Sequence, residues 1–293
     1  MDVSVIIVTY NSAEHISACL QSVLAQKGVS FEIIVADNAS QDDTLKELAN
    51  YHIRVIANRE NVGFGRGNNA AFAVSAGRYL YLLNPDARLT APNALAELCR
   101  RMDANPSWGM AGTRVQSSDG ISESPPSPEY PAQRHTHRDF SKLPGKIAWI
   151  SGASIIVRRE LYEKLGGFDP GFFLYSEETD FCLRMRELGH EIGYVPNISV
   201  EHIGGASEDM RDLSELSARK LKGLLLFRQK HYPVEDCVFL AKRDLQRARL
   251  RMYWNGFLAR WQRPQSKAWR KYQQYHGIWQ ASRDYLSSTG HKP

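Results

Sequence analysis

The sequence predicts an α/β fold with a mostly parallel central sheet flanked by helices, followed by a C-terminal helical extension. Over the first hundred residues, apolar runs typical of buried strands alternate with segments of helical spacing. The alternation stops in a stretch rich in Pro and Ser, and the last eighty residues read as helices rich in Lys and Arg. Alternating strand and helix units of this size are typical of a parallel sheet covered on both faces.

Each element follows from the hydrophobic pattern of its segment. The expected strands are Val3–Thr9, Phe31–Ala36, Ile53–Ala57 and Tyr79–Leu83, and the expected helices are Ser12–Gln26, Asp42–Asn50, Asn68–Ala76 and Asn93–Ala104. After an interruption at Gln116–Lys146, which a lid, a substrate wall or a disordered insertion would explain, structure resumes with Ile147–Val157, a helix near Thr179–Leu188 and a strand-like Glu191–Val195. The chain reads as helix from about Met210, so the expected domains are 1–209 and 210–293.

Composition and charge narrow the class of protein. The chain is 43% hydrophobic and 24% charged, as in ordinary globular proteins. It has no basic leader and no run of about 18 apolar residues, so we expect neither a signal peptide nor a spanning helix. Its four cysteines are widely spaced, which fits a reducing cytoplasm better than a disulfide framework or a zinc ribbon. From Arg219 onward there are 17 Lys/Arg and four Asp/Glu, so an acidic body carries a basic tail suited to polyanions.

Polar side chains follow three of the expected strands. They lie in Thr9-Tyr10-Asn11, Asp37-Asn38-Ala39-Ser40 and Asn84-Pro85-Asp86. Parallel α/β sheets bind ligands beyond the carboxyl ends of their strands. A carboxylate there can hold a base or ribose, and a second one suits Mg²⁺ or Mn²⁺. Taken singly, each Asp is often only a helix cap or a turn residue.

A glycine-rich stretch, Asn61–Asn69, follows the third expected strand. A dinucleotide fingerprint would need glycines directly after the first strand, and Thr9–Ser12 has none. The stretch would let the backbone approach a diphosphate, with Arg66 adding charge. An ordinary glycine-rich turn explains it equally well.

Three acids in four positions, Glu177, Glu178 and Asp180, open a segment of helical spacing. The helix dipole favours acids in a first turn, so charge compensation alone would explain them. Their aromatic neighbours also suit a general base beside a bound sugar. His202 follows a strand-like run where a metal ligand could stand, although a lone histidine is more often structural.

The chain contains five motifs in this order: Val3–Asn11, Asp37–Ser40, Gly63–Asn69, Leu82–Asp86, and Gly167–Asp169 leading into Glu177–Asp180. Together they resemble the family 2 inverting glycosyltransferases with the GT-A fold. The branch they resemble is the rhamnosyltransferase-like one that builds cell-surface polysaccharides. The resemblance covers about residues 3–232.

The resemblance implies a role for each matching position. Thr9 and Asp37 match nucleotide-binding positions, and Gly152 matches a backbone position near the donor. Asp86 matches the metal ligand of a DXD-type motif, in which Asn84 replaces the first acid and would contact the ribose or diphosphate of the donor. The expected donor-binding set is completed by Tyr10, Asn11, Asn38, Gly65, Arg66 and Asn69.

The implied reaction is a single displacement with inversion at the anomeric carbon. Glu178 matches the catalytic base, with a longer side chain than the usual Asp, and Glu177 and Asp180 are its alternates. Mg²⁺ or Mn²⁺ held by Asp86 and His202, which resembles a downstream metal-binding histidine, would neutralise the leaving diphosphate. The expected donor is dTDP-rhamnose and the expected acceptor is a lipid-diphosphate-linked glycan; UDP-hexose and UDP-N-acetylhexosamine are the alternative donors.

Two other functions stay open. A sugar nucleotidyltransferase would want a glycine-rich, basic turn after the first strand, which Thr9–Ser12 lacks. A non-catalytic glycan-binding relative would tolerate loss of Asp86 or of the three acids, yet all are present.

The segment Lys242–Trp261 mixes basic and aromatic residues at helical spacing. A helix of this kind can lie in a membrane interface, so we expect a cytoplasmic protein that is peripheral on the inner membrane surface. The alternative is a helix that packs on the catalytic domain or on a second subunit of a homodimer. No recognition motif accompanies the charge, so nucleic acid is not an expected partner.

Overall fold

The structure is a computed structural model that describes residues 1–117, 124–203, 212–261 and 266–291. The chain divides into two compact units, each described by itself below. The sheet unit consists of Met1–Tyr130, Ser141–Phe173 and Glu177–Ser207, and the helical unit consists of Pro131–Phe140, Leu174–Ser176 and Glu208–Pro293. The domain boundary expected at 209/210 lies outside the described residues.

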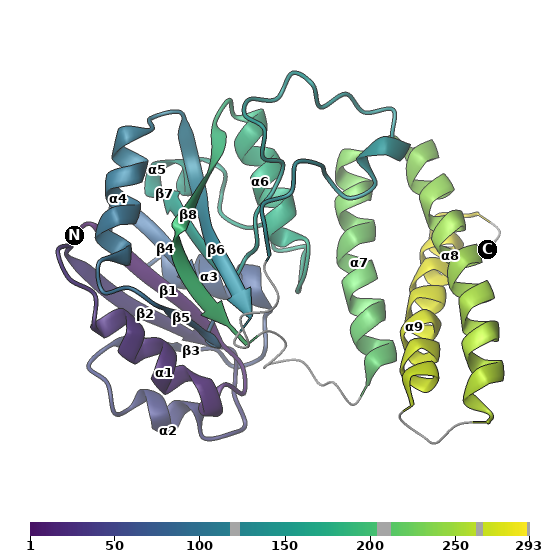
Figure 1. Ribbon diagram of the computed structural model, residues 1–293, viewed down its shortest axis with the longest axis horizontal. Helices are drawn as coiled ribbons and strands as arrows, with labels where there is room; N and C mark the ends of the chain where they lie inside the picture. The colour runs from purple at the N-terminus through teal and green to yellow at the C-terminus, as the bar shows by residue number, and fades with distance from the viewer. Residues whose placement is uncertain (118–123, 204–211, 262–265, 292–293) are drawn as a thin grey trace. The chain divides into compact units, whose positions relative to one another are not determined.

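The described strands of the sheet unit form one mixed sheet in the order β3-β2-β1-β4-β7-β6-β8-β5 (Figure 1). Their bounds are β1 (Val3–Thr9), β2 (Phe31–Asp37), β3 (Arg54–Ala57), β4 (Tyr79–Leu83), β5 (Ala87–Leu89), β6 (Trp108–Ser117), β7 (Ser154–Arg158) and β8 (Glu191–His202). β1 pairs in parallel with β2 and β4, β2 with β3, and β6 with β8. β7 runs antiparallel to both β4 and β6, and β5 runs antiparallel to β8.

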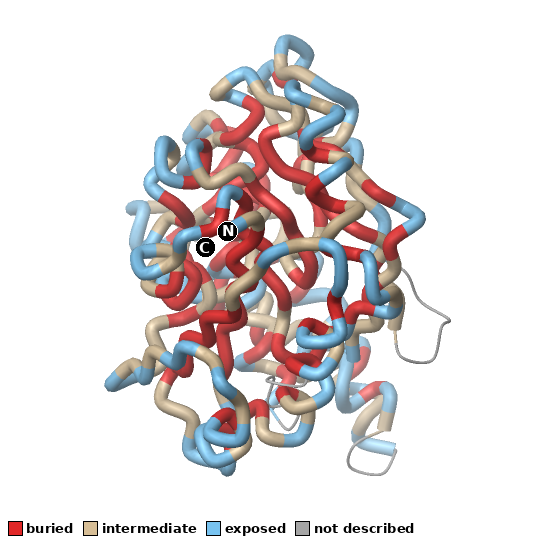
Figure 2. The backbone as a smooth tube through the Cα atoms, turned by 90° about the vertical axis from the view of Figure 1, so that its left-hand side faces the viewer, coloured by how far each residue is buried: buried red, intermediate tan, exposed pale blue. Residues whose placement is uncertain are grey.

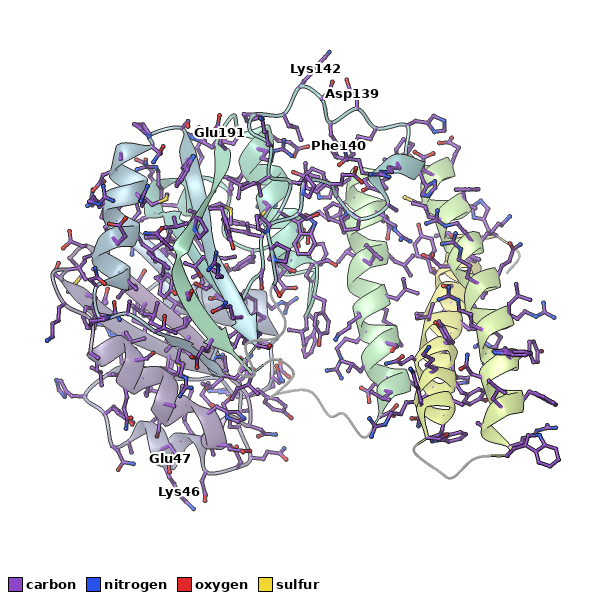
Figure 3. All side chains as sticks on the ribbon, viewed as in Figure 1. Lys46, Glu47, Asp139, Phe140, Lys142 and Glu191 are labelled. Carbon is purple, nitrogen blue, oxygen red and sulfur yellow. The ribbon has the colours of Figure 1, made fainter. Side chains whose placement is uncertain are left out.

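Helices cover both faces of this sheet because strand residues alternate between two cores. Val5 and Ile7 belong to one buried cluster with side chains of α1 (Ala13–Leu24) and α4 (Ala94–Ala104). Ile6 and Val8 belong to the other, with α3 (Phe64–Phe72), α5 (Arg159–Lys164) and α6 (Glu177–Glu187). β1 and β4 are buried throughout and β2 over its last five residues, whereas β3 is mostly exposed. Figure 2 colours the buried backbone red. Outside them, Lys46 of the short α2 (Thr44–Leu48) points away from the sheet (Figure 3).

The structure confirms the α/β architecture and corrects several expected elements. β1 and β4 have the expected bounds, because each is a continuous apolar run. α3 begins at Phe64 rather than Asn68, so most of the glycine-rich stretch is helical. β8 extends to His202, seven residues beyond Val195. β5, β6 and α5 were not expected, since they are short or interrupted by polar residues.

The helical unit contains α7 (Leu213–His231), α8 (Val234–Ala259) and α9 (Lys267–Ser288). Its core lies among all three helices and includes Leu221, Leu225, Ala241, Leu245, Ala281 and Leu286. The segment Pro131–Phe140 belongs to the same unit and is tied to the first turn of α8, where the Asp236 carboxylate accepts hydrogen bonds from Thr136 and from the backbone and ring of His137. Among the described helices, none combines the length and the apolar character that crossing a bilayer requires.

Candidate functional site

Asp86 and His202 come together at one edge of the sheet, although 116 positions separate them in the sequence. β5 pairs antiparallel with β8 so that Ala87 lies opposite His202, and Asp86 directly precedes this pair. The backbone amide of Ile203 donates to the Asp86 carbonyl at 3.1 Å, which extends the pairing by one residue. As a result, the Asp86 Oδ1 lies 3.1 Å from the His202 Nε2. The Asn84 amide nitrogen also lies 3.1 Å from that ring nitrogen.

The chemistry of Asp86 and His202 fits a divalent cation. Carboxylate oxygen and imidazole nitrogen are ligands that Mn²⁺ accepts. Two adjacent ligands of an octahedral ion, each at about 2.1 Å, lie about 3 Å apart, which is the observed spacing. In the part of the chain that the structure describes, no group of three or more His, Cys, Asp or Glu side chains could hold a metal ion. A bound ion would therefore need further ligands from substrate phosphates and water, as is common for Mg²⁺.

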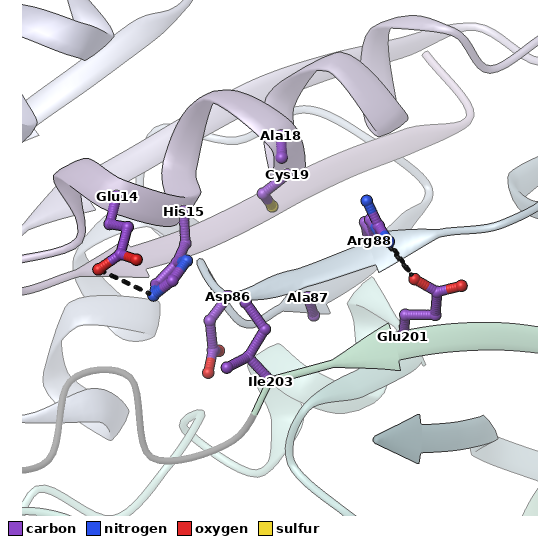
Figure 4. Close-up of a pocket in the computed structure, with 9 residues that line it drawn as sticks. All are labelled: Glu14, His15, Ala18, Cys19, Asp86, Ala87, Arg88, Glu201 and Ile203. Atoms are coloured by element: carbon purple, nitrogen blue, oxygen red, sulfur yellow. Dashed lines mark hydrogen bonds and ion pairs between the residues drawn. The ribbon is translucent and has the colours of Figure 1, made fainter. Parts of the chain in front are cut away.

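A small pocket of about 150 Å³ lies on the α1 side of Asp86 (Figure 4). α1 contributes Glu14, His15 and Cys19, and the strand edge contributes Arg88 and Glu201. Ligand pockets usually measure about 300–1,000 Å³, so this pocket alone is too small for a sugar nucleotide. Glu14 and His15 were not among the residues expected from the sequence, and they lie in the first turn of α1.

Thr9 and Asp37 meet because β1 and β2 are parallel neighbours in register. The Asp37 carboxylate is fully buried and accepts hydrogen bonds from the Thr9 hydroxyl at 2.8 Å and from the hydroxyl and backbone amide of Ser40. Asn11 has a positive φ of 50°, and its side-chain oxygen accepts from the Gln41 amide at 2.8 Å. These bonds fix the two strand ends against each other, and a nucleotide-binding role for Thr9, Asn11 and Asp37, and for the half-buried Tyr10, stays a prediction.

Asn38 and the glycine-rich stretch make contacts within the sheet unit. Asn38 is buried, donates to the Gly63 carbonyl at 3.1 Å and accepts from the Asn58 amide at 2.8 Å. The Asn69 side chain bonds the backbone of Phe168 through both its oxygen and its nitrogen.

The other members of this stretch pack against the same downstream loop. A Cβ on Gly65 would lie 3.0 Å from the Phe168 Cβ. Arg66 donates to the Pro170 carbonyl at 3.0 Å. The stretch therefore holds the loop that leads toward α6, and donor contacts by Asn38, Gly65, Arg66 and Asn69 stay predictions.

The three acids at the start of α6 have different environments. Glu177 is buried, and its Oε2 has no hydrogen-bond partner among the described residues. Burial, and then the charges of Glu178 and Asp180, raise the pKa of Glu177 well above its usual range. Asp180 is fully buried and pairs with Arg184 at 2.7 Å. Glu178 is half-buried, so it is the most accessible of the three.

Gly152 connects the base candidate to the strand ends. A Cβ on Gly152 would lie 3.6 Å from the Glu178 Cβ, so the backbone at this position runs directly beside that acid. The neighbouring Ala153 carbonyl accepts a hydrogen bond from the backbone N–H of Asn84 at 3.1 Å. The segment before β7 therefore links Asn84, and through it His202, to the start of α6.

Comparison of the chain with known proteins identifies the family to which it is similar. The model for "Glycosyl transferase family 2" matches residues 4–166, a region that contains Thr9, Asp37, Asp86 and Gly152 and ends before Glu177. The N-acetylglucosaminyl-diphospho-decaprenol L-rhamnosyltransferase of Mycobacterium tuberculosis is 24% identical over 261 residues, which cover 78% of this chain and 84% of that protein. The rhamnosyltransferase WbbL of Escherichia coli is 25% identical over 68% of this chain and 83% of that protein.

Two further matches show how much of a longer relative the chain covers and which solved structure has a similar fold. The chain spans 26% of the length of a protein from Sinorhizobium fredii that is 26% identical over 74% of this chain. The mannosyltransferase PcManGT from Pyrobaculum calidifontis, solved with GDP-Man and Mn²⁺, has a TM-score of 0.58 at 17% identity, covering 98% of this chain and 74% of that one. Because the family model matches more than half of the chain and the neighbouring structure has the same architecture, the chain belongs to glycosyl transferase family 2 and has the GT-A fold.

Proposed function

We propose that this protein transfers rhamnose, with inversion, from dTDP-rhamnose to a lipid-diphosphate-linked precursor of a cell-surface polysaccharide. The single observation that carries the proposal is the cluster of Asp86, His202 and Asn84 near the carboxyl end of β4, where open α/β sheets commonly bind ligands. A divalent cation held by such a cluster would stabilise the negative charge of a diphosphate leaving group.

Glu178 is the proposed catalytic base. Its half-buried position lets it meet an acceptor, whereas Glu177 is buried and Asp180 is held by Arg184. Glu178 accepts the proton of the acceptor hydroxyl as that oxygen bonds to the anomeric carbon. The bond between this carbon and the diphosphate oxygen breaks with an oxocarbenium-like transition state, and dTDP leaves.

Asp86 and His202 are the residues that would hold the proposed Mg²⁺ or Mn²⁺. When bound, such an ion supplies positive charge that stabilises the leaving diphosphate. The Mn²⁺ in the PcManGT complex supports this proposal.

The names of two relatives support the choice of substrates. Both are named rhamnosyltransferases, and one name specifies a diphospho-decaprenol-linked acceptor. An acceptor of this type resides in a membrane, so we also propose that the basic helical unit contacts the inner membrane surface. UDP-hexose and UDP-N-acetylhexosamine are the alternative donors.

Nucleotide binding tests the donor and the metal together. Isothermal titration with dTDP, UDP and GDP, each with Mn²⁺ and with EDTA, should give Mn²⁺-dependent binding of dTDP. Asp86→Asn should abolish the Mn²⁺-dependent binding of dTDP. Glu201→Gln is the matched control, because it removes a carboxylate from the same strand edge that is paired with Arg88 instead. Tighter binding of UDP than of dTDP would redirect the donor assignment, and no binding of any nucleotide would refute the proposal.

Turnover with dTDP-rhamnose and a polyprenyl-diphosphate-linked N-acetylglucosamine tests the base. Glu178→Gln should lower kcat by about 10²- to 10⁴-fold while dTDP binding stays intact, because a general base acts in the transition state. Glu177→Gln is its neighbouring control and should retain most of the activity. Equal losses in the two variants would contradict the assignment of Glu178.

A further inference from the structure

The second half of α8 exposes an apolar face that a helix of an isolated globular unit would normally bury. Its members on α8 are Leu250, Tyr253, Trp254 and Phe257, and Trp261 lies in the turn directly after the helix. Leu250, Trp254 and Trp261 are 71%, 64% and 82% exposed. We call these five residues the aromatic stripe. The spacing of the four helical members, three, one and three positions, places them along one side of α8. The buried residues Ala241, Leu245 and Ala248 lie on a different side of the helix. Ala241 and Leu245 belong to the core of the helical unit.

A groove of about 540 Å³ borders this stripe between α8 and α9. Its cations are Lys242 and Arg249 from α8 and Arg283 from α9, and Gln246, Tyr253 and Trp279 complete its polar and aromatic lining. The Arg283 guanidinium lies 4.7 Å from the centre of the Trp279 ring, and the Arg249 guanidinium lies 6.0 Å from that of Tyr253. Tyr253 belongs to both the stripe and the groove, so the two surfaces are continuous.

Positive charge predominates in this region. Between Asp244 and Asp284 the sequence contains nine Lys/Arg and no Asp or Glu. In the described part of the chain, neither Lys242 nor Arg249 forms an ion pair, and Arg283 pairs only with its exposed neighbour Asp284 at 3.3 Å. The groove therefore lacks internal carboxylates to neutralise it and is complementary to an anion.

We infer that this surface docks on an anionic bilayer, with a lipid phosphate in the groove between α8 and α9 and the aromatic stripe in the interface beside it. Arg and Lys bind phosphate through short, charge-assisted hydrogen bonds. Trp and Tyr favour the depth of the lipid headgroups, where an apolar ring and a polar edge are both satisfied. A soluble phosphate would use the groove and leave the stripe in water, whereas a bilayer occupies both. The inference rests on the proposed membrane contact and names the surface that makes it.

Vesicle co-sedimentation of the full chain, without nucleotide or acceptor, tests the inference separately from the transfer reaction. The protein should bind vesicles of phosphatidylcholine with phosphatidylglycerol much more tightly than vesicles of phosphatidylcholine alone. The variant K242Q/R249Q should bind the anionic vesicles about 30-fold more weakly at low ionic strength, as expected for two cations near an anionic surface. The variant W254S/F257S should lose binding even where the cations remain.

The matched control is K27Q/K164Q, which removes two exposed cations from the sheet unit. It should bind anionic vesicles within about two-fold of the wild type, since no apolar stripe adjoins those positions, and thermal melts should show that every variant is folded. Equal weakening by the groove variant and the control would overturn the inference. So would a concentration-dependent dimer in sedimentation velocity that W254S/F257S abolishes while vesicle binding is unchanged, because the stripe would then be a subunit interface.

Discussion

Arg184 should hold the start of α6 in place by neutralising a buried carboxylate. Asp180 is fully buried, and Arg184, whose side chain is 18% exposed, pairs with it at 2.7 Å. The same guanidinium donates to the carbonyls of Leu165 at 3.0 Å and Gly167 at 2.9 Å. One side chain thus joins the helix that carries Glu178 to the loop before it. Replacing Arg184 with Met leaves the carboxylate buried without its guanidinium.

We expect Arg184→Met to lower the free energy of unfolding by about 3–5 kcal/mol, the usual cost of removing one partner from a buried ion pair. Asp180→Asn keeps an acceptor for Arg184 and should cost about 1.5–3 kcal/mol. The double variant should be more stable than Arg184→Met alone, because it also removes the buried charge that Arg184 neutralises. Arg100→Met, which breaks the exposed pair of Arg100 and Glu97, should cost at most about 1 kcal/mol.

Urea unfolding of the four variants, followed by circular dichroism, measures these differences. Turnover separates the structural role of Asp180 from a catalytic one: folded Asp180→Asn should retain kcat within about ten-fold, far above Glu178→Gln. The reasoning fails if Arg184→Met costs no more than Arg100→Met, or if the double variant is less stable than both single ones. A kcat for Asp180→Asn as low as that of Glu178→Gln would show that Asp180 takes part in proton transfer.

Two further predictions concern stability. Because the pKa of Glu177 is raised, the folded state holds the proton of this carboxyl more tightly than the unfolded chain does. The protonated carboxyl therefore contributes to the free energy of unfolding below about pH 4.3, and this contribution is lost as the pH rises through the pKa of the folded state. Urea unfolding across a pH series should show that Glu177→Gln removes this pH-dependent loss of stability. The same dependence of the free energy of unfolding on pH in the variant and the wild type would contradict the prediction. Gly63→Ala should cost about 2–4 kcal/mol, because Gly63 has a φ of +86° and a Cβ there would lie 2.1 Å from the Phe173 carbonyl oxygen. Gly166→Ala has a similar φ of +70° with nothing within 4 Å, so it should cost only about 1 kcal/mol, and equal melting temperatures for the two variants would exclude the clash.

The sequence predicts the first half of the sheet well because its strands are continuous apolar runs. β1 and β4 are buried on both faces, so their hydrophobic pattern alone gives their bounds. β6 includes the polar Arg114 and Gln116, and β5 has three residues, so neither carries a pattern that distinguishes a strand from a loop. The glycine-rich stretch was expected to precede its helix, because glycine disfavours helix. In the structure most of the stretch is helical, and its glycines leave room for close packing of Gly65 on Phe168 and of Gly67 on Val8.

By itself the sequence determined which residues are candidates for the chemistry, namely the acids and amides at the strand ends and at the start of α6, because residue type and local pattern are properties of a segment. Only the tertiary structure decided which of them meet. Asp86 approaches His202 through the register of β5 against β8, and Glu178 lies beside Gly152 through the packing of α6. The same holds for the three acids, whose order along the chain says nothing about burial. Their different exposures arise because a helix turns successive side chains toward different surroundings, and those surroundings come from distant parts of the chain.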